Sequence, residues 1–504
     1  MPTAIINGKE VTVPRGTPII RAAAQLGIDI PHFCYHPALS VPGNCRMCLV
    51  EVEGARKLEP ACYFKVEDGM KIHTENDKVH TARRAVLEFI LINHPVDCPI
   101  CDKAGECKLQ DYYMAYDAQP SRLTTNKVAK AKVVPVGPHV VLDAERCILC
   151  TRCVRFCDEI TGTSELVFVE RGDRSELRTF PGKELDNPYS MNVTDVCPVG
   201  ALTTRDFRFN RRVWRLSSTN SICTGCAKGC NIYLDHHQGQ AERYRPRFNA
   251  DVNEYWMCDE GRLSYKRIHS DRLTTIRVGD EEGISWPRAA RKVAQQIKAS
   301  GYAPEEIVFV ASAQASTESL IAAQTWVKDF LGTEQIYWSG KPDGHADDFL
   351  ISADKNPNRS GVALVLGEAA FKNDAHALLE KLEQKTTRLL VMMGDDLPFD
   401  AETRKRFDAV LPTIEHFVLI APHGNALAKA AWAVLPAATH AEEDGTFINE
   451  EGFMQPYEEA FAPLEQALPA WDIFVRLAHG ADEELSVSSF ADLQQAIESK
   501  VAAE

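Results

Sequence analysis

The sequence has no apolar run long enough to cross a bilayer. Its uninterrupted apolar stretches are short, for example Phe89–Ile92, Val362–Leu366 and Ala430–Leu435, whereas a membrane-spanning helix needs roughly 18–20 such residues. The first ten residues, MPTAIINGKE, contain neither a basic segment nor an apolar core, so we expect no secretory signal. These absences predict a soluble, cytosolic protein without direct membrane insertion.

Excess positive charge and glycine-rich phosphate loops are also missing. Lysine and arginine number 56 against 71 aspartate and glutamate residues, and the net charge of −15 argues against a nucleic-acid partner. We therefore interpret the arginine-rich segment 203–215 as a solvated or interface face. Neither a G-x-G-x-x-G after a strand nor a Walker motif is present, so the sequence predicts no nucleotide site. We also identify no catalytic residues.

Cysteine is confined to the front half of the chain. All 16 cysteines lie between Cys34 and Cys258. A disulfide scaffold is typical of short secreted chains, whereas this chain has 504 residues, 45% hydrophobic and 25% charged, which is an ordinary globular balance. The cysteines are therefore better interpreted as metal ligands, and the length predicts three or more domains.

Local patterns predict two kinds of structure. Asn7-Gly8 predicts a hairpin within residues 3–13, followed by a helix capped by Thr17 that begins at Pro18 and ends at Gly27. Asp77 is expected to cap a helix that Pro95 terminates. After residue 275, the apolar runs IVFVA, GVALVLG, RLLVMMG and HFVLIA alternate with helical patterns, which predicts strands of a parallel α/β sheet.

The first cysteine set suits a [2Fe–2S] cluster. Its members are Cys34, Cys45, Cys48 and Cys62, spaced C-x10-C-x2-C-x13-C. The plant-type ferredoxin pattern has four residues where this chain has ten, and zinc is the alternative. His32 and His36 flank Cys34 and raise a Rieske-type possibility, but four cysteines are already present. We therefore interpret both histidines as bystanders.

The second set contains one histidine. It consists of His94, Cys98, Cys101 and Cys107, in the sequence HPVDCPICDKAGEC. A [4Fe–4S] cluster needs four ligands and only three cysteines are present, so His94 is expected to supply the fourth. In isolation this pattern could also bind zinc.

The third set has one cysteine too many. Cys147, Cys150, Cys153 and Cys157 form a C-x2-C-x2-C-x3-C run, and Cys197-Pro198 follows forty residues later. In two-cluster bacterial ferredoxins the fourth cysteine of each run ligates the other cluster. Positions 187, 190 and 193 hold Asn187, Ser190 and Val193 instead of cysteine. The remaining [4Fe–4S] cluster should therefore take Cys197, leaving Cys157 unused.

A fourth [4Fe–4S] set closes the series. Its members are Cys223, Cys226, Cys230 and Cys258. The order and spacing of all four sets resemble the large peripheral-arm iron–sulfur subunit of respiratory complex I, the G subunit of bacterial NADH:quinone oxidoreductases. The resemblance covers the front 270 residues. It implies one [2Fe–2S] cluster and three [4Fe–4S] clusters, the last of them off the main electron path.

The back half resembles the molybdopterin oxidoreductase fold, most visibly in VLPAATHAEEDGTFINEEGFMQ at 434–455. Active members usually carry C-x-K-G after the last cluster cysteine, but Glu260 stands in the lysine position here, and the chain after Cys258 is short. We expect no molybdenum. A molybdenum formate dehydrogenase catalytic subunit and an electron-transfer subunit of an NAD-linked hydrogenase are the alternatives.

The resemblance implies an α+β multidomain chain. It divides into a β-grasp [2Fe–2S] ferredoxin domain, a histidine-ligated [4Fe–4S] domain, a bacterial-ferredoxin-like [4Fe–4S] domain, a [4Fe–4S] domain of molybdopterin-oxidoreductase type and a truncated α/β domain, at 1–77, 78–139, 140–215, 216–272 and 273–504. It also implies a flavin- and NADH-binding partner, other peripheral-arm partners, quinone reached only through partners, and a peripheral location on the cytoplasmic side of the inner membrane. The assembly would be a translocase, and this chain alone would have no complete active site.

Overall fold

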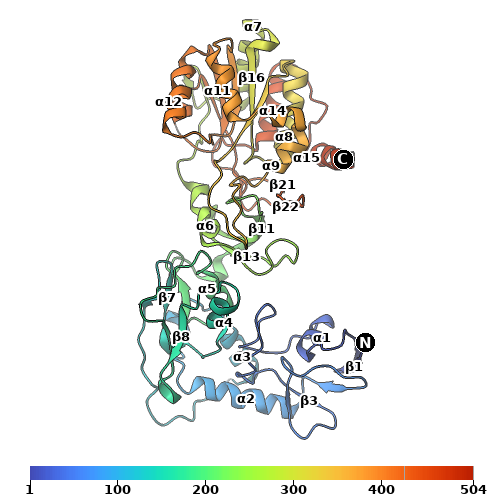
Figure 1. Ribbon diagram of the computed structural model, residues 1–504, viewed down its shortest axis with the longest axis vertical. Helices are drawn as coiled ribbons and strands as arrows, with labels where there is room; N and C mark the ends of the chain where they lie inside the picture. The colour runs from blue at the N-terminus through green and yellow to red at the C-terminus, as the bar shows by residue number, and fades with distance from the viewer. Residues whose placement is uncertain (118, 425, 503–504) are drawn as a thin grey trace. The chain divides into compact units, whose positions relative to one another are not determined.

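The computed structural model describes residues 1–117, 119–424 and 426–502. The chain forms two compact units, Met1–Leu216 and Ser217–Glu504 (Figure 1). Each unit is described by itself. Among the described residues, no helix combines the length and the apolar character needed to cross a membrane.

The first unit opens with a five-stranded mixed sheet in the order β2-β1-β5-β3-β4. Its elements are β1 (Thr3–Ile6), β2 (Lys9–Thr12), α1 (Ile19–Gln25), β3 (Leu49–Val52), β4 (Glu59–Pro60) and β5 (Lys71–His73). β1 and β2 pair antiparallel around Asn7-Gly8, which confirms the predicted hairpin. Ile6, Ile19, Val50 and Ile72 are fully buried in one core that packs α1 against the sheet.

Two predicted helix caps are wrong by one residue. Pro18 is extended and bridges to Lys65, so α1 starts at Ile19, and the Thr17 hydroxyl donates to the Pro14 carbonyl. The second helix, α2 (Asp77–Leu91), is capped by Asn76, whose side-chain oxygen accepts from the Val79 amide at 2.9 Å. In both places the residue next to the expected position adopts the extended cap geometry.

The rest of the first unit consists of short elements between the cysteines. These are α3 (Lys108–Tyr116), β6 (Val134–Pro135), β7 (Val140–Leu142), α4 (Arg152–Glu159), β8 (Leu166–Val169), β9 (Glu176–Thr179), α5 (Asn192–Val196) and β10 (Leu202–Thr204). β10, β7 and β6 form one antiparallel sheet, and β8 and β9 form a hairpin.

The second unit begins with a three-stranded antiparallel sheet, followed by a seven-stranded sheet. The small sheet holds β11 (Ser217–Ile222), β12 (Asn231–His237) and β13 (Gln240–Pro246), and α6 (Asp259–Leu263) follows it. The large sheet has the order β15-β14-β20-β19-β18-β16-β17. Its strands are β14 (Arg277–Val278), β15 (Glu281–Glu282), β16 (Ile307–Ser312), β17 (Ile336–Ser339), β18 (Leu389–Met393), β19 (His416–Ala421) and β20 (Ala433–Pro436).

Five strands of the large sheet, β16 to β20, are parallel, which confirms the predicted α/β sheet, and β14 adds an antiparallel edge. Helices cover both faces. They are α7 (Trp286–Ser300), α8 (Thr317–Trp326), α9 (Arg359–Leu366), α10 (Glu368–Phe371), α11 (Ala375–Glu383), α12 (Ala401–Val410), α13 (Ala426–Ala430), α14 (Ala470–Gly480) and α15 (Phe490–Val501). Figure 1 shows α11 and α12 on one side of β16, with α8 and α14 on the other. The hairpin β21 (Gly445–Ile448) and β22 (Met454–Tyr457) packs on α8.

One of the four predicted strands is a helix. The run GVALVLG lies within α9, where Gly361, Val362 and Val365 are buried. This one-sided burial is the spacing of a helix face, and Val362 and Val365 belong to the large hydrophobic core of the second unit, where α9 packs against α8. A short apolar run does not distinguish a buried strand from a buried helix. The strand beside β16 is instead β17, which the sequence reasoning did not identify.

Candidate iron–sulfur cluster sites

The first cysteine set forms two sulfur pairs. Cys34, Cys48 and Cys62 are buried, and the thiols of Cys34 and Cys45 hydrogen-bond to each other, as do those of Cys48 and Cys62. In the first pair this contact lowers the pKa of Cys45 to about 5 and raises that of Cys34. In the second pair it lowers the pKa of Cys62 and raises that of Cys48. Two cysteines on each of two iron atoms is the ligand arrangement of a [2Fe–2S] cluster.

The two histidines near Cys34 are neutral. Burial, followed by the charges of Arg152 and Arg155, lowers the pKa of His36 to about 3. Burial also lowers the pKa of His32, whose Nδ1 hydrogen-bonds with the Ile30 carbonyl at 2.8 Å. The bystander interpretation of both histidines stays a prediction.

All members of the second set line one cavity. His94 follows α2, Cys98 starts a short 3₁₀ turn (Cys98–Ile100), and Cys107 caps α3. With Cys101 they border about 680 Å³ of empty space, part of it open to solvent. His94 Nδ1 is buried without a hydrogen-bond partner, and burial lowers the pKa of its ring to about 4. A neutral imidazole with a free nitrogen is the form that binds metals.

A glycine lets the chain approach this second cavity closely. A Cβ atom placed on Gly200 would lie 2.4 Å from Cys101 Sγ, so no other residue fits there without a shift of the sulfur. Gly200 follows Cys197 by three residues, and the Lys108 amide, next to Cys107, donates to the Pro198 carbonyl at 3.0 Å. The second and third sets are therefore neighbours.

The cavity of the third cysteine set is lined by Cys197 but not by Cys157. Its wall contains Cys147, Cys150, Cys153 and Cys197 around about 300 Å³ of empty space. Cys157 is fully buried but is not part of this wall, and its thiol hydrogen-bonds to Glu165. The structure thus brings together the four side chains that the interrupted ferredoxin run predicts.

The loop through this third set is built from unusual backbone. Leu149 and Thr151, which flank Cys150, have φ values of +56° and +66°. Left-handed backbone is unfavourable for residues other than glycine and persists only where the surroundings over-determine it, often at functional sites. The loop therefore keeps a shape that presents its cysteines to one cavity.

The fourth set is gathered around a glycine in the second unit. Cys223, Cys226, Cys230 and Cys258 are all buried. The Gly261 amide donates to Cys258 Sγ at 3.3 Å, and a Cβ on Gly261 would lie 2.9 Å from Cys223 Sγ. The Cys223 amide also donates to the Cys230 carbonyl at 2.9 Å. Residues far apart in the sequence therefore meet at Gly261.

Burial keeps most of these thiols protonated in the absence of a metal. It raises the pKa of Cys107 and Cys150 to about 11 and that of Cys147 and Cys258 to about 12, and neighbouring thiols add to the effect in each case. Since the thiolate is the metal ligand, a bound cationic iron cluster would supply the charge that lets these sulfurs deprotonate together. The donor sets fit such clusters.

No group of three or more His, Cys, Asp or Glu side chains within the described residues is arranged to hold a metal ion directly. The sites are defined instead by the two cavities, the sulfur pairs and the close backbone approaches. The four ligand sets as complete sets stay predictions.

Buried arginines, which the sequence reasoning missed, join the sites of the first unit. Arg152 donates to the Tyr35 carbonyl and, at 3.2 Å, to the Val196 carbonyl, while Arg155 donates to the Cys34 carbonyl at 2.5 Å. Both arginines lie on α4, three residues apart, and face inward. Their positive charge can offset the negative charge of a thiolate-bound cluster. The R-C-V-R spacing is the only local sequence signal for these two arginines.

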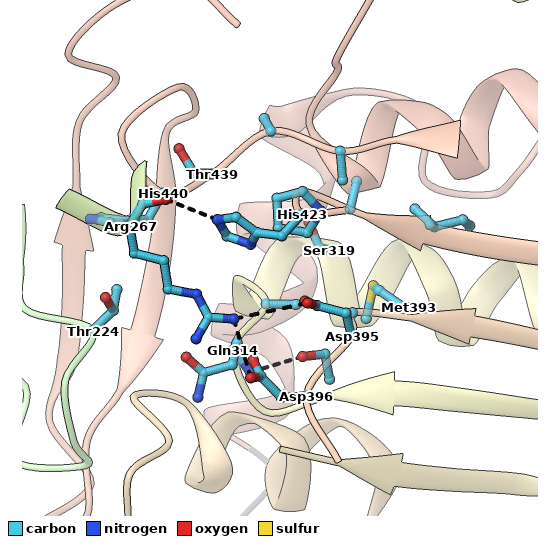
Figure 2. A pocket seen from close by; sticks show the side chains of 18 of the residues that line it. Thr224, Arg267, Gln314, Ser319, Met393, Asp395, Asp396, His423, Thr439 and His440 are labelled. Carbon is cyan, nitrogen blue, oxygen red and sulfur yellow. Dashed lines mark hydrogen bonds and ion pairs between the residues drawn. The ribbon is translucent and has the colours of Figure 1, made fainter. Parts of the chain in front are cut away.

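The expectation that the back half holds no molybdenum stays a prediction. The cavity at the ends of β16 and β18 (Figure 2), with about 890 Å³ of empty space, has no cysteine among the described residues of its wall, and Glu260 stands two residues after Cys258, in the position where a lysine is usual in active relatives. We derive no step through a molybdopterin.

Family models match five segments of the chain. By their descriptions these are a "2Fe-2S iron-sulfur cluster binding domain" at 3–77, an "NADH-ubiquinone oxidoreductase-G iron-sulfur binding region" at 83–122, "NADH-quinone oxidoreductase subunit 3, ferredoxin-like domain" at 137–203, "NADH-ubiquinone oxidoreductase NDSU1/NuoG-like, 4Fe-4S domain" at 216–266 and "Molybdopterin oxidoreductase" at 356–479. The predicted fold class, α+β with ferredoxin-type domains before a molybdopterin-oxidoreductase-type domain, is confirmed.

Curated relatives carry consistent names. The G subunit of the NADH-quinone oxidoreductase of Streptomyces coelicolor is 43% identical over 59% of this chain, and the protein of the same name from Rickettsia bellii is 29% identical over 97%. The NADH-ubiquinone oxidoreductase 75 kDa subunit of Reclinomonas americana is 38% identical over 81%. The chain spans 36%, 88% and 58% of the length of these relatives, respectively.

A solved structure shares part of the sequence. One chain of an NAD⁺-reducing [NiFe]-hydrogenase crystal structure in the H2-reduced state is 28% identical, over 42% of this chain and 91% of that chain, with a TM-score of 0.39.

The cysteine-lined cavities, the sulfur pairs and the matched models define a multi-cluster iron–sulfur protein with a molybdopterin-oxidoreductase-type domain. Both [2Fe–2S] and [4Fe–4S] domain types are represented. The chain belongs to the G-subunit family of NADH-quinone oxidoreductases, as the cysteine spacings predicted.

Proposed function

We propose that this chain is the iron–sulfur relay subunit of an NADH:quinone oxidoreductase, carrying electrons from a flavin subunit toward quinone. The main supporting observation is that two separate cavities of the first unit are each lined by all four residues of one predicted ligand set. His94, Cys98, Cys101 and Cys107 line the one, and Cys147, Cys150, Cys153 and Cys197 line the other.

The proposal assigns one [2Fe–2S] cluster to Cys34, Cys45, Cys48 and Cys62 and one [4Fe–4S] cluster to each of the other three sets. Such clusters accept and release electrons one at a time, at potentials set by ligand type, charge and burial. The residues of this chain would hold them and supply compensating charge.

The first unit also provides close contact between its sets. Arg155 links the Cys34 loop to α4, and the Tyr112 hydroxyl on α3 accepts from the His32 amide at 3.2 Å. Gly200 in turn brings the Cys197 segment against Cys101. The Cys34 loop therefore touches the elements of both other sets, which suits a relay.

A partner must supply the step from NADH. A hydride donor gives up two electrons together, so a flavin must stand between it and one-electron carriers. We propose a flavin- and NADH-binding partner and further peripheral-arm partners, with quinone reached through them. We also propose that the assembly is a translocase whose peripheral arm lies on the cytoplasmic side of the inner membrane.

The test is to purify the full-length chain, reconstitute it anaerobically and assay iron, sulfide and EPR signals. One binuclear and three tetranuclear clusters correspond to about 14 iron atoms per chain. Titration with NADH should leave the clusters oxidised until the flavoprotein is added. Zinc in place of iron, or cluster reduction by NADH without any flavoprotein, would show that the proposed role is wrong.

A further inference from the structure

The first turn of α4 carries an arginine that contacts the segments of both the first and the third cysteine set. Arg152 is 8% exposed. It donates to the Val196 carbonyl at 3.2 Å, directly before Cys197 of the third set. It also donates to the Tyr35 carbonyl, directly after Cys34 of the first set. One buried guanidinium therefore lies against the backbone beside a cysteine of each set.

This arginine has no carboxylate to balance its charge. Among the described residues Arg152 forms no ion pair, and a guanidinium stays charged in proteins. Burial lowers its pKa, and the negative charges that oppose this effect are those of the Cys150, Cys197 and Cys34 thiolates. Burying an unpaired cation is costly. Ionised sulfurs of the two cysteine sets are therefore the groups that would offset that cost.

One hydrogen-bond donor of Arg152 is also unused. Its Nε atom is buried and has no hydrogen-bond partner. In Arg155, three residues later, Nε donates to the Thr151 hydroxyl at 3.1 Å, and the other two nitrogens donate to the carbonyls of Ser40 and Cys34. An unpaired buried N–H group costs free energy, and hydrogen bonds to sulfur are one of the means by which proteins set cluster potentials. The Nε group of Arg152 is therefore available to donate to sulfur.

The second cysteine set also has an arginine beside it, but the charge of that arginine is balanced. Arg146 lines the cavity of the second set. Its guanidinium pairs with Asp143 at 2.8 Å and with Asp97 at 2.9 Å. Two carboxylates therefore cancel the positive charge at that site, whereas the charge of Arg152 is left to act on the sulfurs around it.

We propose that Arg152 raises the reduction potentials of two clusters at once, the [2Fe–2S] cluster and the [4Fe–4S] cluster of the third set. The proposal rests on the electron-relay function proposed above. Reduction adds one electron, and hence one negative charge, to each cluster, and a nearby uncompensated cation stabilises that charge. Because one cation acts on both clusters, it governs how readily electrons enter the pair more than it governs the step from one cluster to the other.

The test is an anaerobic redox titration of the reconstituted full-length chain, followed by EPR. The binuclear signal is identified as the one lost in Cys45→Ala, and the signal of the third set as the one lost in Cys197→Ser. In Arg152→Met both midpoint potentials should fall, each by about 59 mV or more, which is a tenfold change in a one-electron equilibrium. Arg56→Met, which removes an exposed arginine of the same unit, should leave both potentials unchanged.

Arg152→Lys separates the effect of the charge from that of the contacts to the two carbonyls. Lysine keeps the positive charge but not the forked donors of arginine, so it should recover at least half of the fall in both potentials. A role confined to holding the two carbonyls predicts no recovery. Arg152→Gln serves as the neutral variant if Arg152→Met does not fold, and it should give the same fall in both potentials.

The proposal would be overturned by unchanged potentials in a folded neutral variant, by a fall in one potential alone, or by a lysine variant as low as the neutral one. Absence of both signals from the unmodified chain would refute the relay function itself, and this proposal with it.

Discussion

Cys157 and Cys197 offer a matched pair of substitutions at the third site. Both are buried, but only Cys197 lines the cavity shared by Cys147, Cys150 and Cys153. We predict that Cys197→Ser removes the cluster of this site, whereas Cys157→Ser retains it. The expected change is a loss of about four of some 14 iron atoms per chain in the first variant and none in the second.

The contacts of the two thiols explain the difference. Cys157 hydrogen-bonds to Glu165, whose carboxylate also accepts from the Asn187 amide at 2.9 Å. A serine hydroxyl can donate to the same carboxylate, so Cys157→Ser should cost about 1 kcal/mol or less. At position 197 a neutral hydroxyl replaces the thiolate that the metal requires.

The assay is metal analysis combined with low-temperature EPR on both variants, reconstituted side by side with the unmodified chain. Far-ultraviolet circular dichroism controls for unfolding. Equal loss of the signal in the two variants, or loss in Cys157→Ser alone, would refute the assignment of Cys197 as the fourth ligand.

Three further changes test other sites. His94→Ala in the assembled complex should slow NADH-driven quinone reduction and spare NADH oxidation by an artificial acceptor, and an equal fall in both rates would place the site outside the relay. Gly200→Ala should remove the EPR signal of the second cluster, because the added Cβ would lie 2.4 Å from Cys101 Sγ. An unchanged signal would show that residue 200 does not lie against Cys101 in the loaded protein. Burial raises the pKa of Glu443 from 4.5 to about 8, so its contribution to stability is complete below pH 4.5 and is lost as pH rises to about 8, by up to about 5 kcal/mol. The free energy of unfolding of the second unit, measured with urea, should therefore fall over that pH range. The same fall with pH in the Glu443→Gln variant would contradict the prediction.

The residues that line the two cysteine-containing cavities of the first unit could be predicted because their signal is local. Metal ligands are few in type, and spacings such as that of Cys147, Cys150 and Cys153 place them on one loop. The place of Cys197 in the wall of the same cavity, forty residues after Cys157, was predictable from the cysteines absent at 187, 190 and 193. The hairpin at Asn7-Gly8 was likewise predictable, since its turn depends on two residues.

Features that depend on distant contacts could not be predicted. The run in α9 is a helix whose Val362 and Val365 join the core where α9 packs against α8, and its own sequence permits a strand equally well. The roles of Arg152 and Arg155 depend on carbonyls more than 100 residues earlier. The cavity at the ends of β16 and β18 likewise exists only once these strands lie side by side.

The arginines of α4 also link two of the predicted cluster sites. Because Arg155 donates to the Cys34 carbonyl and Arg152 to that of Tyr35, the first turn of one helix fixes a loop that carries a ligand of a different cluster. Cys153 lies between these arginines on the same helix. If both sites hold clusters as proposed, loss of the cluster at Cys153 would loosen α4 and the Cys34 loop together, so we expect damage at one site to reach the other.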